Sequence, residues 1–480
     1  MMMRTRRNIF VTFVLIGLIA CLGIGTLATV ALITLRAVNT PSTPTVETLS
    51  QDTARVFPTQ RPPSRLPTTE TTTPTTVSLP PDIAAQMDEI EQQVTRIRGL
   101  QPRTPLRREL LTTSQLHQKV TDDFLKDYTP AEVEKDVTTL SLFGLLPRNF
   151  DLYSLLRDLY TEQIAGFYDD DTKTMYVIQD EAFRGPQRST YAHEYTHALQ
   201  DQTFDFKGGL KMTDEVCDQQ SEYCAAVQSL IEGDASLTEQ FWLLNAATPE
   251  DRKQIQEFYQ NYQSPVFDTT PEFLQQDFLF PYRQGLDFVL DLYQKGRWDA
   301  INAAFKHPPL STEQILHPEK YPNDAPLEVN VPDLSPVLTG YEPYDEGEIG
   351  EWYLYLILAY AEKQAWRLNE KIAAQAAAGW GGDAYQVWRN PQNEETLLLV
   401  NIRWDSENDA KEFYNAFRQY GIQRWGQPLS TTTTTSRWQE SAAGQSILIR
   451  ENSHTIWILG SDAKAVTDAL EAFQTLIPQP

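Results

Sequence analysis

The most constraining feature of the sequence is a pair of histidines, His193 and His197, with Glu194 directly after the first. No helix-breaking residue interrupts Ser189–Gln202, so we expect this segment to form one helix. Residues four apart on a helix point from the same face, and both imidazoles can therefore bind one metal ion. Glu194 lies at the edge of that face, where its carboxylate can reach a metal-bound water without being a ligand itself.

A third ligand is expected from the next long helix. The HExxH pattern is typical of zinc peptidases, in which three protein side chains usually bind the ion and one position stays open. Thr203 stands where one class of these enzymes has its third histidine, and the remaining histidines are distant in the sequence. Glu232 lies among apolar residues of the predicted helix Gln219–Ala246, where a lone carboxylate is costly to bury unless it is paired or bound to metal. We therefore predict a Zn²⁺ site formed by His193, His197 and Glu232.

The segment His193–Gln200, followed on a later helix by Ile231–Ala235, resembles the gluzincin branch of the zincin metallopeptidases, the thermolysin-like group. It is also similar to uncharacterised membrane-anchored bacterial proteins of this type. By architecture the resemblance covers residues 84–330. It implies that the predicted ligands bind zinc and that Glu194 is the catalytic general base. It also implies that Thr174–Ile178 is an edge strand offering its backbone to an extended peptide.

Two details of the site stay open. The residue four positions after Glu232 is Ser236, where the thermolysin type often has an acid, so Asp234 or Asp201 is expected to hold a ligand histidine instead. A donor that stabilises the oxyanion is also expected. The candidates for this donor are Tyr168, Tyr191, Tyr195 and His317. For His317, a surface position at the end of a short helix capped by Ser311 is favoured over one in the active-site cleft.

The predicted fold class is α+β, with a mainly helical zincin-like domain at residues 82–335 and a C-terminal region at residues 336–480. A hairpin is expected from Ile164–Tyr168 and Thr174–Ile178. The predicted helices of the first domain are Ile83–Ile97, Glu132–Leu145, Leu152–Glu162, Arg188–Thr203, Gln219–Ala246 and Phe273–Lys295.

The C-terminal region is predicted to open with a helical segment, Glu348–Ala378, that ends at Gly379. A turn over Gly379–Asp383 and a loop at Thr431–Thr435 are expected within it. The rest follows a ββα pattern twice, which is typical of a small α+β sandwich. Its predicted elements are the strands Tyr385–Trp388, Thr396–Trp404, Ser446–Arg450 and Thr455–Leu459, and the helices Asn408–Tyr420 and Ala463–Leu476.

The N-terminal segment is predicted to anchor the chain in a membrane. Residues 8–35 form an uncharged, mostly apolar run that as a helix is about 40 Å long, which is enough to span a bilayer and too long for a signal-peptide core. The arginines before it predict a cytoplasmic tail at residues 1–7. Residues 36–81, rich in Thr and Pro, are expected to be a disordered stalk. Leu18–Cys21 resembles a bacterial lipobox, so a lipoprotein is the alternative, and it too keeps the chain tethered outside the cytoplasm.

Charge and cysteine content narrow the function further. The formal net charge of −25 argues against nucleic-acid binding and against adhesion to anionic lipid, both of which need basic surfaces. Three cysteines are too few for a disulfide-built scaffold. Cys217 and Cys224 are predicted to pair, which requires the following helix to begin near Ser221, because within one helix they would be about 10 Å apart.

These observations together predict an extracytoplasmic zinc metallopeptidase, held at the cell membrane by one N-terminal helix, that acts on a peptide or protein substrate. Two alternatives remain. One is a noncatalytic cell-surface module that keeps a zinc site for binding a partner. The other is a zinc hydrolase of a different bond, such as a cell-wall cross-link.

Overall fold

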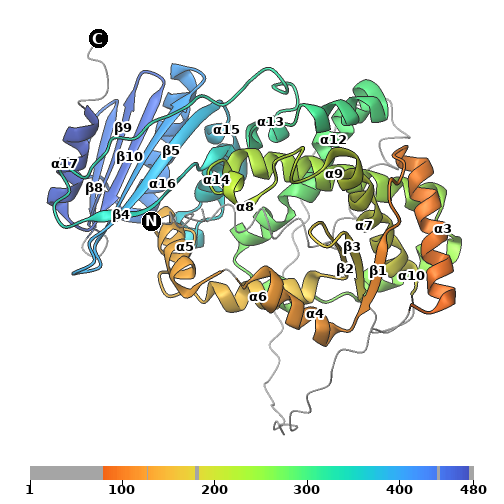
Figure 1. The fold of residues 1–480 in the computed structure, drawn as a ribbon. Coiled ribbons are helices and arrows are strands. Elements are labelled where there is room, and N and C mark those ends of the chain that lie inside the picture. The colour runs from red at the N-terminus through yellow and green to blue at the C-terminus, as the bar shows by residue number, and fades with distance from the viewer. Residues whose placement is uncertain (1–78, 127, 179–182, 441–443, 475–480) are drawn as a thin grey trace, which may run out of the picture.

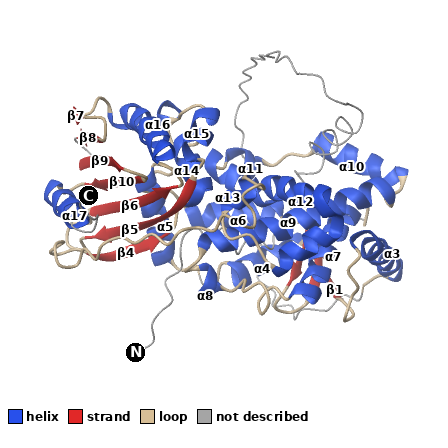
Figure 2. Ribbon diagram, turned by 90° about the horizontal axis from the view of Figure 1, so that it is seen from above, coloured by secondary structure: helices blue, strands red, loops and turns tan. Residues whose placement is uncertain are grey.

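The computed structural model describes residues 79–126, 128–178, 183–440 and 444–474. Its fold is α+β, as predicted, with helices filling one end of the molecule and a large sheet forming the other (Figure 1, Figure 2). The predicted anchor at residues 8–35 and the predicted stalk up to residue 78 lie outside the described residues. Among the helices that are described, none is both long and apolar enough to cross a membrane.

Helices of the first part occupy the predicted segments, and short helices lie between them. They are α3 (Pro81–Arg98), α4 (Thr113–Lys119) with a π-helical turn (Val120–Phe124), α5 (Pro130–Phe143), α6 (Leu152–Gln163), α7 (Gly185–Phe204), α8 (Asp214–Cys217), α9 (Ser221–Asn245), α10 (Pro249–Asn261), α11 (Pro265–Thr269), α12 (Glu272–Lys306) and α13 (Thr312–Leu316). Local signals set several ends: Thr129 and Glu132 form a capping box at α5, and Gly144 ends that helix in the left-handed conformation. α12 extends past the predicted end at Lys295. The chain kinks at Gly296 and Arg297, and a second helical segment then continues to Lys306.

A small sheet packs on α7. Its strands are β1 (Arg107–Leu111), β2 (Gly166–Asp169) and β3 (Thr174–Ile178), in the order β1-β3-β2. The predicted hairpin is confirmed, because β2 and β3 pair in antiparallel register. The prediction that Thr174–Ile178 is an edge strand is wrong, because β1 pairs with it in parallel along its whole length. Charged residues in β1 hide that strand from a pattern based on apolar alternation. The edge strand beside α7 is β2.

Two glycines let α9 and α12 cross closely. A Cβ added to Gly233 of α9 would lie 2.2 Å from the carbonyl oxygen of Gly285, and one added to Gly285 would lie 2.2 Å from the carbonyl oxygen of Ser229. Only glycine permits such an approach of two backbones. Because Gly233 directly follows Glu232, this crossing fixes the height and rotation of α9 at the predicted third ligand.

The predicted disulfide between Cys217 and Cys224 is confirmed. α8 ends at Cys217 and α9 begins at Ser221, so the bridge spans the break between two helices, as the sequence required. Both cysteines are fully buried in the main hydrophobic core.

We expect removal of this bridge to destabilise the protein measurably. A Cys217→Ser/Cys224→Ser variant should lose about 2–3 kcal/mol of unfolding free energy, because a short loop is no longer closed in the unfolded chain. Urea unfolding of parent, variant and reduced parent measures this loss, and the last two should agree. Alkylation of both thiols in unreduced parent would contradict the bridge.

The C-terminal sheet contains the predicted ββα pattern twice, with further strands at its edges. In the described residues it has seven strands in the order β4-β5-β6-β10-β9-β8-β7. They are β4 (Glu342–Gly347), β5 (Trp380–Arg389), β6 (Thr396–Trp404), β7 (Ser430–Thr431), β8 (Thr435–Glu440), β9 (Gly444–Glu451) and β10 (His454–Gly460). α16 (Glu407–Trp425) and α17 (Ala463–Gln474) cover opposite faces (Figure 1). In β6, Leu397 and Leu399 face α17 whereas Leu398 and Val400 face α16, which explains a continuous apolar run.

Two expectations for this region are wrong in detail. The helical segment Glu348–Ala378 is broken into α14 (Gly350–Ala359), a 3₁₀ turn (Gln364–Trp366) and α15 (Glu370–Ala377). Asn369 starts α15 by accepting a hydrogen bond from the Lys371 amide, a capping signal that the sequence carries. The expected turn over Gly379–Asp383 belongs largely to β5, whose register shifts between Trp380 and Gly382. The expected loop at Thr431–Thr435 is confirmed as the turn of the β7–β8 hairpin, and its two end residues belong to those strands.

Buried carboxylates lie where the first helical part of the chain meets the C-terminal region. Asp277 of α12 accepts hydrogen bonds from Trp352 and Tyr353 of α14, and Asp345 of β4 accepts one from Thr139 of α5. Burial raises the pKa of Asp277 to about 6, despite those hydrogen bonds. Burial likewise raises the pKa of Asp136, in α5, to about 8. The ionised forms of these groups therefore weaken the fold.

We expect the unfolding temperature to rise as the pH is lowered from about 8 towards 5. A carboxyl group whose pKa is raised by folding binds its proton more tightly in the folded state, so its stabilising effect is lost as the pH rises through the folded pKa. At pH 8, Asp136→Asn should unfold at a higher temperature than the parent, and the difference should shrink towards pH 5. Thermal unfolding with a chelator present measures this. The exposed Glu471→Gln is the control, and parallel pH profiles for parent and Asp136→Asn would contradict the prediction.

Candidate metal centre

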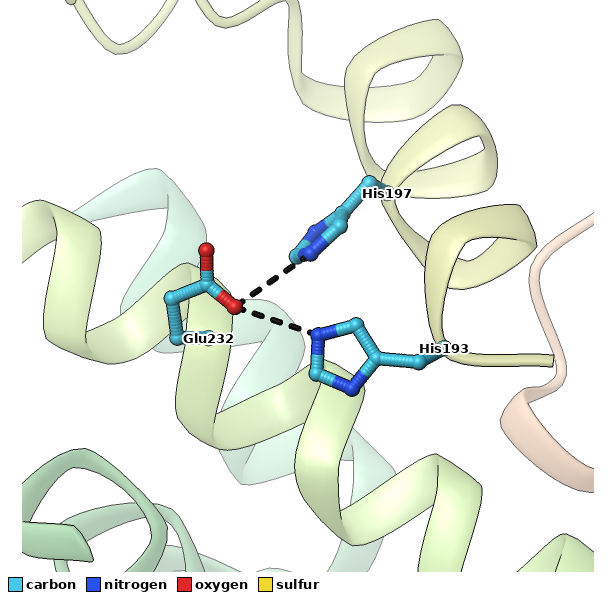
Figure 3. Close-up of side chains that lie close together, drawn as sticks. All are labelled: His193, His197 and Glu232. Atoms are coloured by element: carbon cyan, nitrogen blue, oxygen red, sulfur yellow. Dashed lines mark hydrogen bonds and ion pairs between the residues drawn. The ribbon is translucent and has the colours of Figure 1, made fainter. Parts of the chain in front are cut away.

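The structure brings the three predicted ligands together (Figure 3). His193 and His197 project from α7, and Glu232 projects from α9 towards both imidazoles (Figure 3). The Glu232 Oε2 atom lies 3.1 Å from His193 Nε2 and 3.3 Å from His197 Nε2. All three residues are at most 3% exposed, so bulk water does not screen their charges.

This donor set fits zinc. Two imidazole nitrogens and one carboxylate oxygen are the ligands of many catalytic zinc sites, and a fourth position is left for another ligand. In a tetrahedral site with zinc–ligand distances near 2.0–2.1 Å, the donor atoms are about 3.3 Å apart. The measured separations of 3.1 and 3.3 Å match that edge length.

The electrostatics of the group favour a bound cation. Burial lowers the pKa of His193, but its hydrogen bonds with Glu232 and Glu239 outweigh burial and raise that pKa to about 10. Burial also lowers the pKa of His197, and the Glu232 charge reverses this, so the pKa is raised overall. For Glu232, burial raises the pKa and the two histidines more than offset it, so the pKa is lowered. The Glu232 carboxylate thus places a negative charge between two imidazoles that hold protons more tightly than usual. A bound metal ion would take the place of those protons.

Glu194 lies beside this group and is held by the small sheet. The side chain is 2% exposed, and its Oε2 atom accepts a hydrogen bond of 2.9 Å from the backbone N–H of Tyr168. Tyr168 belongs to β2, the edge strand next to α7. The strand therefore orients the carboxylate that the sequence assigns as general base.

Sequence reasoning missed the residues that hold the far side of each imidazole. His193 Nδ1 lies 3.3 Å from Glu239 Oε2, and the Ser189 hydroxyl donates to Glu239 Oε1 at 2.6 Å. His197 Nδ1 lies 2.9 Å from Gln200 Oε1. Helical spacing could have found both, because Glu239 is two turns after Glu232 on α9 and Gln200 is one turn after His197 on α7.

The two aspartates expected to hold a ligand histidine do not contact one. Asp201 accepts hydrogen bonds from the Tyr168 hydroxyl and from Lys173. Asp234 accepts one of 2.7 Å from the amide of Gln200, so it acts on His197 only through that side chain. Asp234 also pairs with Arg98 of α3, and both side chains are fully buried.

None of the four expected oxyanion donors is placed at the group. Tyr168 donates to Asp201 and Tyr191 donates to Glu91. Tyr195 shares a hydrogen bond with Thr95 of α3. His317 pairs with Glu351 of α14 at 2.8 Å, which agrees with a position outside the cleft, and Ser311 caps its short helix as predicted. Tyr282 of α12 also lies near the group, with its ring centroid 6.3 Å from that of His193.

A cleft of about 310 Å³ reaches the group at His193 and Glu239. Its walls come from α4, the end of α6, the start of α7, and α10. The aromatic residues that line it there are Phe258 and Tyr259 of α10 and Tyr262 directly after that helix, and their ring centroids lie 5.2–6.4 Å apart. This cleft is wide enough for a side chain of a bound ligand.

Comparison with known proteins identifies only the C-terminal sheet region. Residues 339–471 match a family model described as a domain of unknown function, DUF8575. That segment runs from just before β4 into α17 and does not include α7 or α9. No curated protein and no solved structure matches the chain.

Proposed function

We propose that the protein is a zinc-dependent metallopeptidase of the gluzincin type that hydrolyses peptide bonds outside the cytoplasm. The observation that carries this proposal is the meeting of two α7 imidazoles and one α9 carboxylate at donor separations of 3.1 and 3.3 Å. The buried disulfide supports the location, because such bonds persist outside the reducing cytoplasm. Tethering by residues 8–35 is part of the same proposal.

The side chains divide the chemistry among them. His193, His197 and Glu232 would hold the ion, which when bound lowers the pKa of a water to about 7 and polarises the scissile carbonyl. Glu194 takes the proton from the attacking water and passes it to the leaving amine. The Tyr168 amide keeps the Glu194 carboxylate in one orientation during both transfers.

One observation favours a second function, a noncatalytic zinc-containing binding module. The three ligands are nearly inaccessible, and a closed site is typical of structural zinc. Against it stands the oriented, buried Glu194, which a structural site does not need.

Zinc content and peptide hydrolysis by the full-length protein test the proposal. We expect one zinc per chain, measured by elemental mass spectrometry, and cleavage of casein that stops with a chelator and returns with zinc. Zinc without cleavage of casein or of peptidoglycan cross-link peptides favours the binding module. Cleavage of the cross-link peptides alone indicates a cell-wall hydrolase. Absence of zinc contradicts all three.

A further inference from the structure

Glu239 contacts the ligand histidine that also borders the cleft. Its Oε2 atom lies 3.3 Å from His193 Nδ1, and its Oε1 atom accepts the Ser189 hydroxyl at 2.6 Å. The residue is 8% exposed, and its carboxylate has a partner at each oxygen. Few rotamers satisfy both contacts, so the carboxylate has a defined position against the imidazole ring.

The backbone explains why this carboxylate can reach His193. Glu232 and Glu239 are seven residues apart on α9, which places them on the same face of that helix about two turns apart. Ser189 and His193 are four apart on α7 and likewise share a face. The two faces meet, so Glu232 contacts one nitrogen of the His193 ring while Glu239 contacts the other.

We propose that Glu239, clamped by Ser189, is the positioning residue that fixes the tautomer and orientation of His193 for metal binding. A carboxylate that accepts a hydrogen bond from Nδ1–H keeps the proton on Nδ1, leaves Nε2 unprotonated and directed at the metal, and makes the imidazole a more basic ligand. Ser236, one turn after Glu232, carries no carboxylate. Glu239, two turns after Glu232, provides the carboxylate that supports the ligand histidine.

The two ligand histidines are therefore supported differently. His193 Nδ1 contacts the Glu239 carboxylate, whereas His197 Nδ1 contacts the neutral amide of Gln200. A carboxylate strengthens the ligand more than an amide does, because it stabilises the positive charge that the metal induces on the ring. Loss of the Glu239 charge should therefore weaken metal binding even when the hydrogen bond remains.

Zinc affinity of full-length Glu239→Gln tests this inference, which rests on the metal site of the proposed function and not on peptide hydrolysis. Competition with a chromogenic chelator should show about 10–100-fold weaker zinc binding than in the parent. The variant is isosteric and should unfold at nearly the parent temperature. Ser189→Ala, which keeps the charge and removes the clamp, should weaken binding less. The visible spectrum of Co²⁺-loaded protein should change in Glu239→Gln, because it reports ligand geometry.

The matched control is Glu222→Gln. Glu222 is also a buried carboxylate on α9, but it accepts hydrogen bonds from Thr312 and does not contact either histidine. The zinc affinity of Glu222→Gln should equal that of the parent. An unchanged affinity in Glu239→Gln, or an equal loss in Glu222→Gln, overturns the positioning role. A parent that binds zinc but cleaves no peptide leaves the role intact and removes only the peptidase, whereas a parent that binds no zinc removes both.

Discussion

Replacement of Glu194 by glutamine should lower the rate of peptide hydrolysis by about 10²–10⁴-fold and leave one zinc bound per chain. Glutamine keeps the size of the side chain and can still accept the hydrogen bond from the Tyr168 amide. It cannot take a proton from water. Binding of the metal should be unaffected because the proposed ligands are His193, His197 and Glu232. Steady-state cleavage of a peptide substrate, with zinc content measured on the same sample, tests the prediction.

A ligand variant separates loss of chemistry from loss of metal. His197→Ala should lose both zinc and activity, because one of three donors is gone. Glu194→Asp should keep zinc and recover little activity, because the shorter side chain withdraws the carboxylate. Parent-like hydrolysis by Glu194→Gln would show that another group serves as the base, and loss of zinc from that variant would show that Glu194 contributes to binding.

The parts of the site that the sequence predicted depend on short-range helical geometry. His193 and His197 are four residues apart on one helix, so their common face follows from the helical repeat. Glu232 could be chosen because an isolated acid among apolar residues needs a partner. The disulfide followed in the same way, since the separation of Cys217 and Cys224 allows a bridge only where a helix begins. In the C-terminal sheet, Thr396–Trp404 is predicted as a strand, and the structure explains its apolar run by burying β6 on both faces.

The parts that were missed depend on contacts between distant segments. β1 carries charged residues and becomes a strand by pairing with β3, so no local pattern predicts that β3 is central. β7 and β8 consist mostly of polar residues and lie at one edge of the sheet, so no apolar alternation marks them in the sequence. Glu239 and Gln200 stand at helical spacings that fit the site, yet many other polar residues do so too. Only the crossing of α7 and α9 decides which of them meets a histidine.

Asp234 shows how far the support of the site extends into the fold. It pairs with Arg98, whose Nε atom donates to both carboxylate oxygens at 2.7 and 2.9 Å. It also accepts the Gln200 amide that holds His197. This series of contacts links α3, α9 and α7 to one ligand. In the described part of the chain, Arg98 Nη2 donates to Asn302 and Nη1 has no hydrogen-bond partner, so Asp234 supplies the counter-charge of this buried guanidinium.

We expect Asp234→Ala to lower the unfolding free energy by about 3–5 kcal/mol, because it leaves a fully buried arginine without its counter-charge. The same variant should bind zinc about 10-fold more weakly, because Gln200 loses the charged one of its two amide acceptors and keeps only the Ile231 carbonyl. Denaturant unfolding and chelator competition measure the two effects separately. Asp88→Ala, which removes the partner of Arg108 in an exposed ion pair, should cost less than about 1 kcal/mol and leave zinc affinity unchanged.

The double variant Arg98→Met/Asp234→Ala separates the electrostatic effect from the positional one. Removing the arginine as well removes the unpaired buried charge, so about 2 kcal/mol or more of the lost stability should return. Zinc affinity should stay as low as in Asp234→Ala, because methionine provides no hydrogen-bond acceptor for the Gln200 amide. If stability and affinity recover together, the loss of zinc binding in the single variant reflects general loosening of the fold, and the link from Asp234 through Gln200 to His197 carries no specific effect.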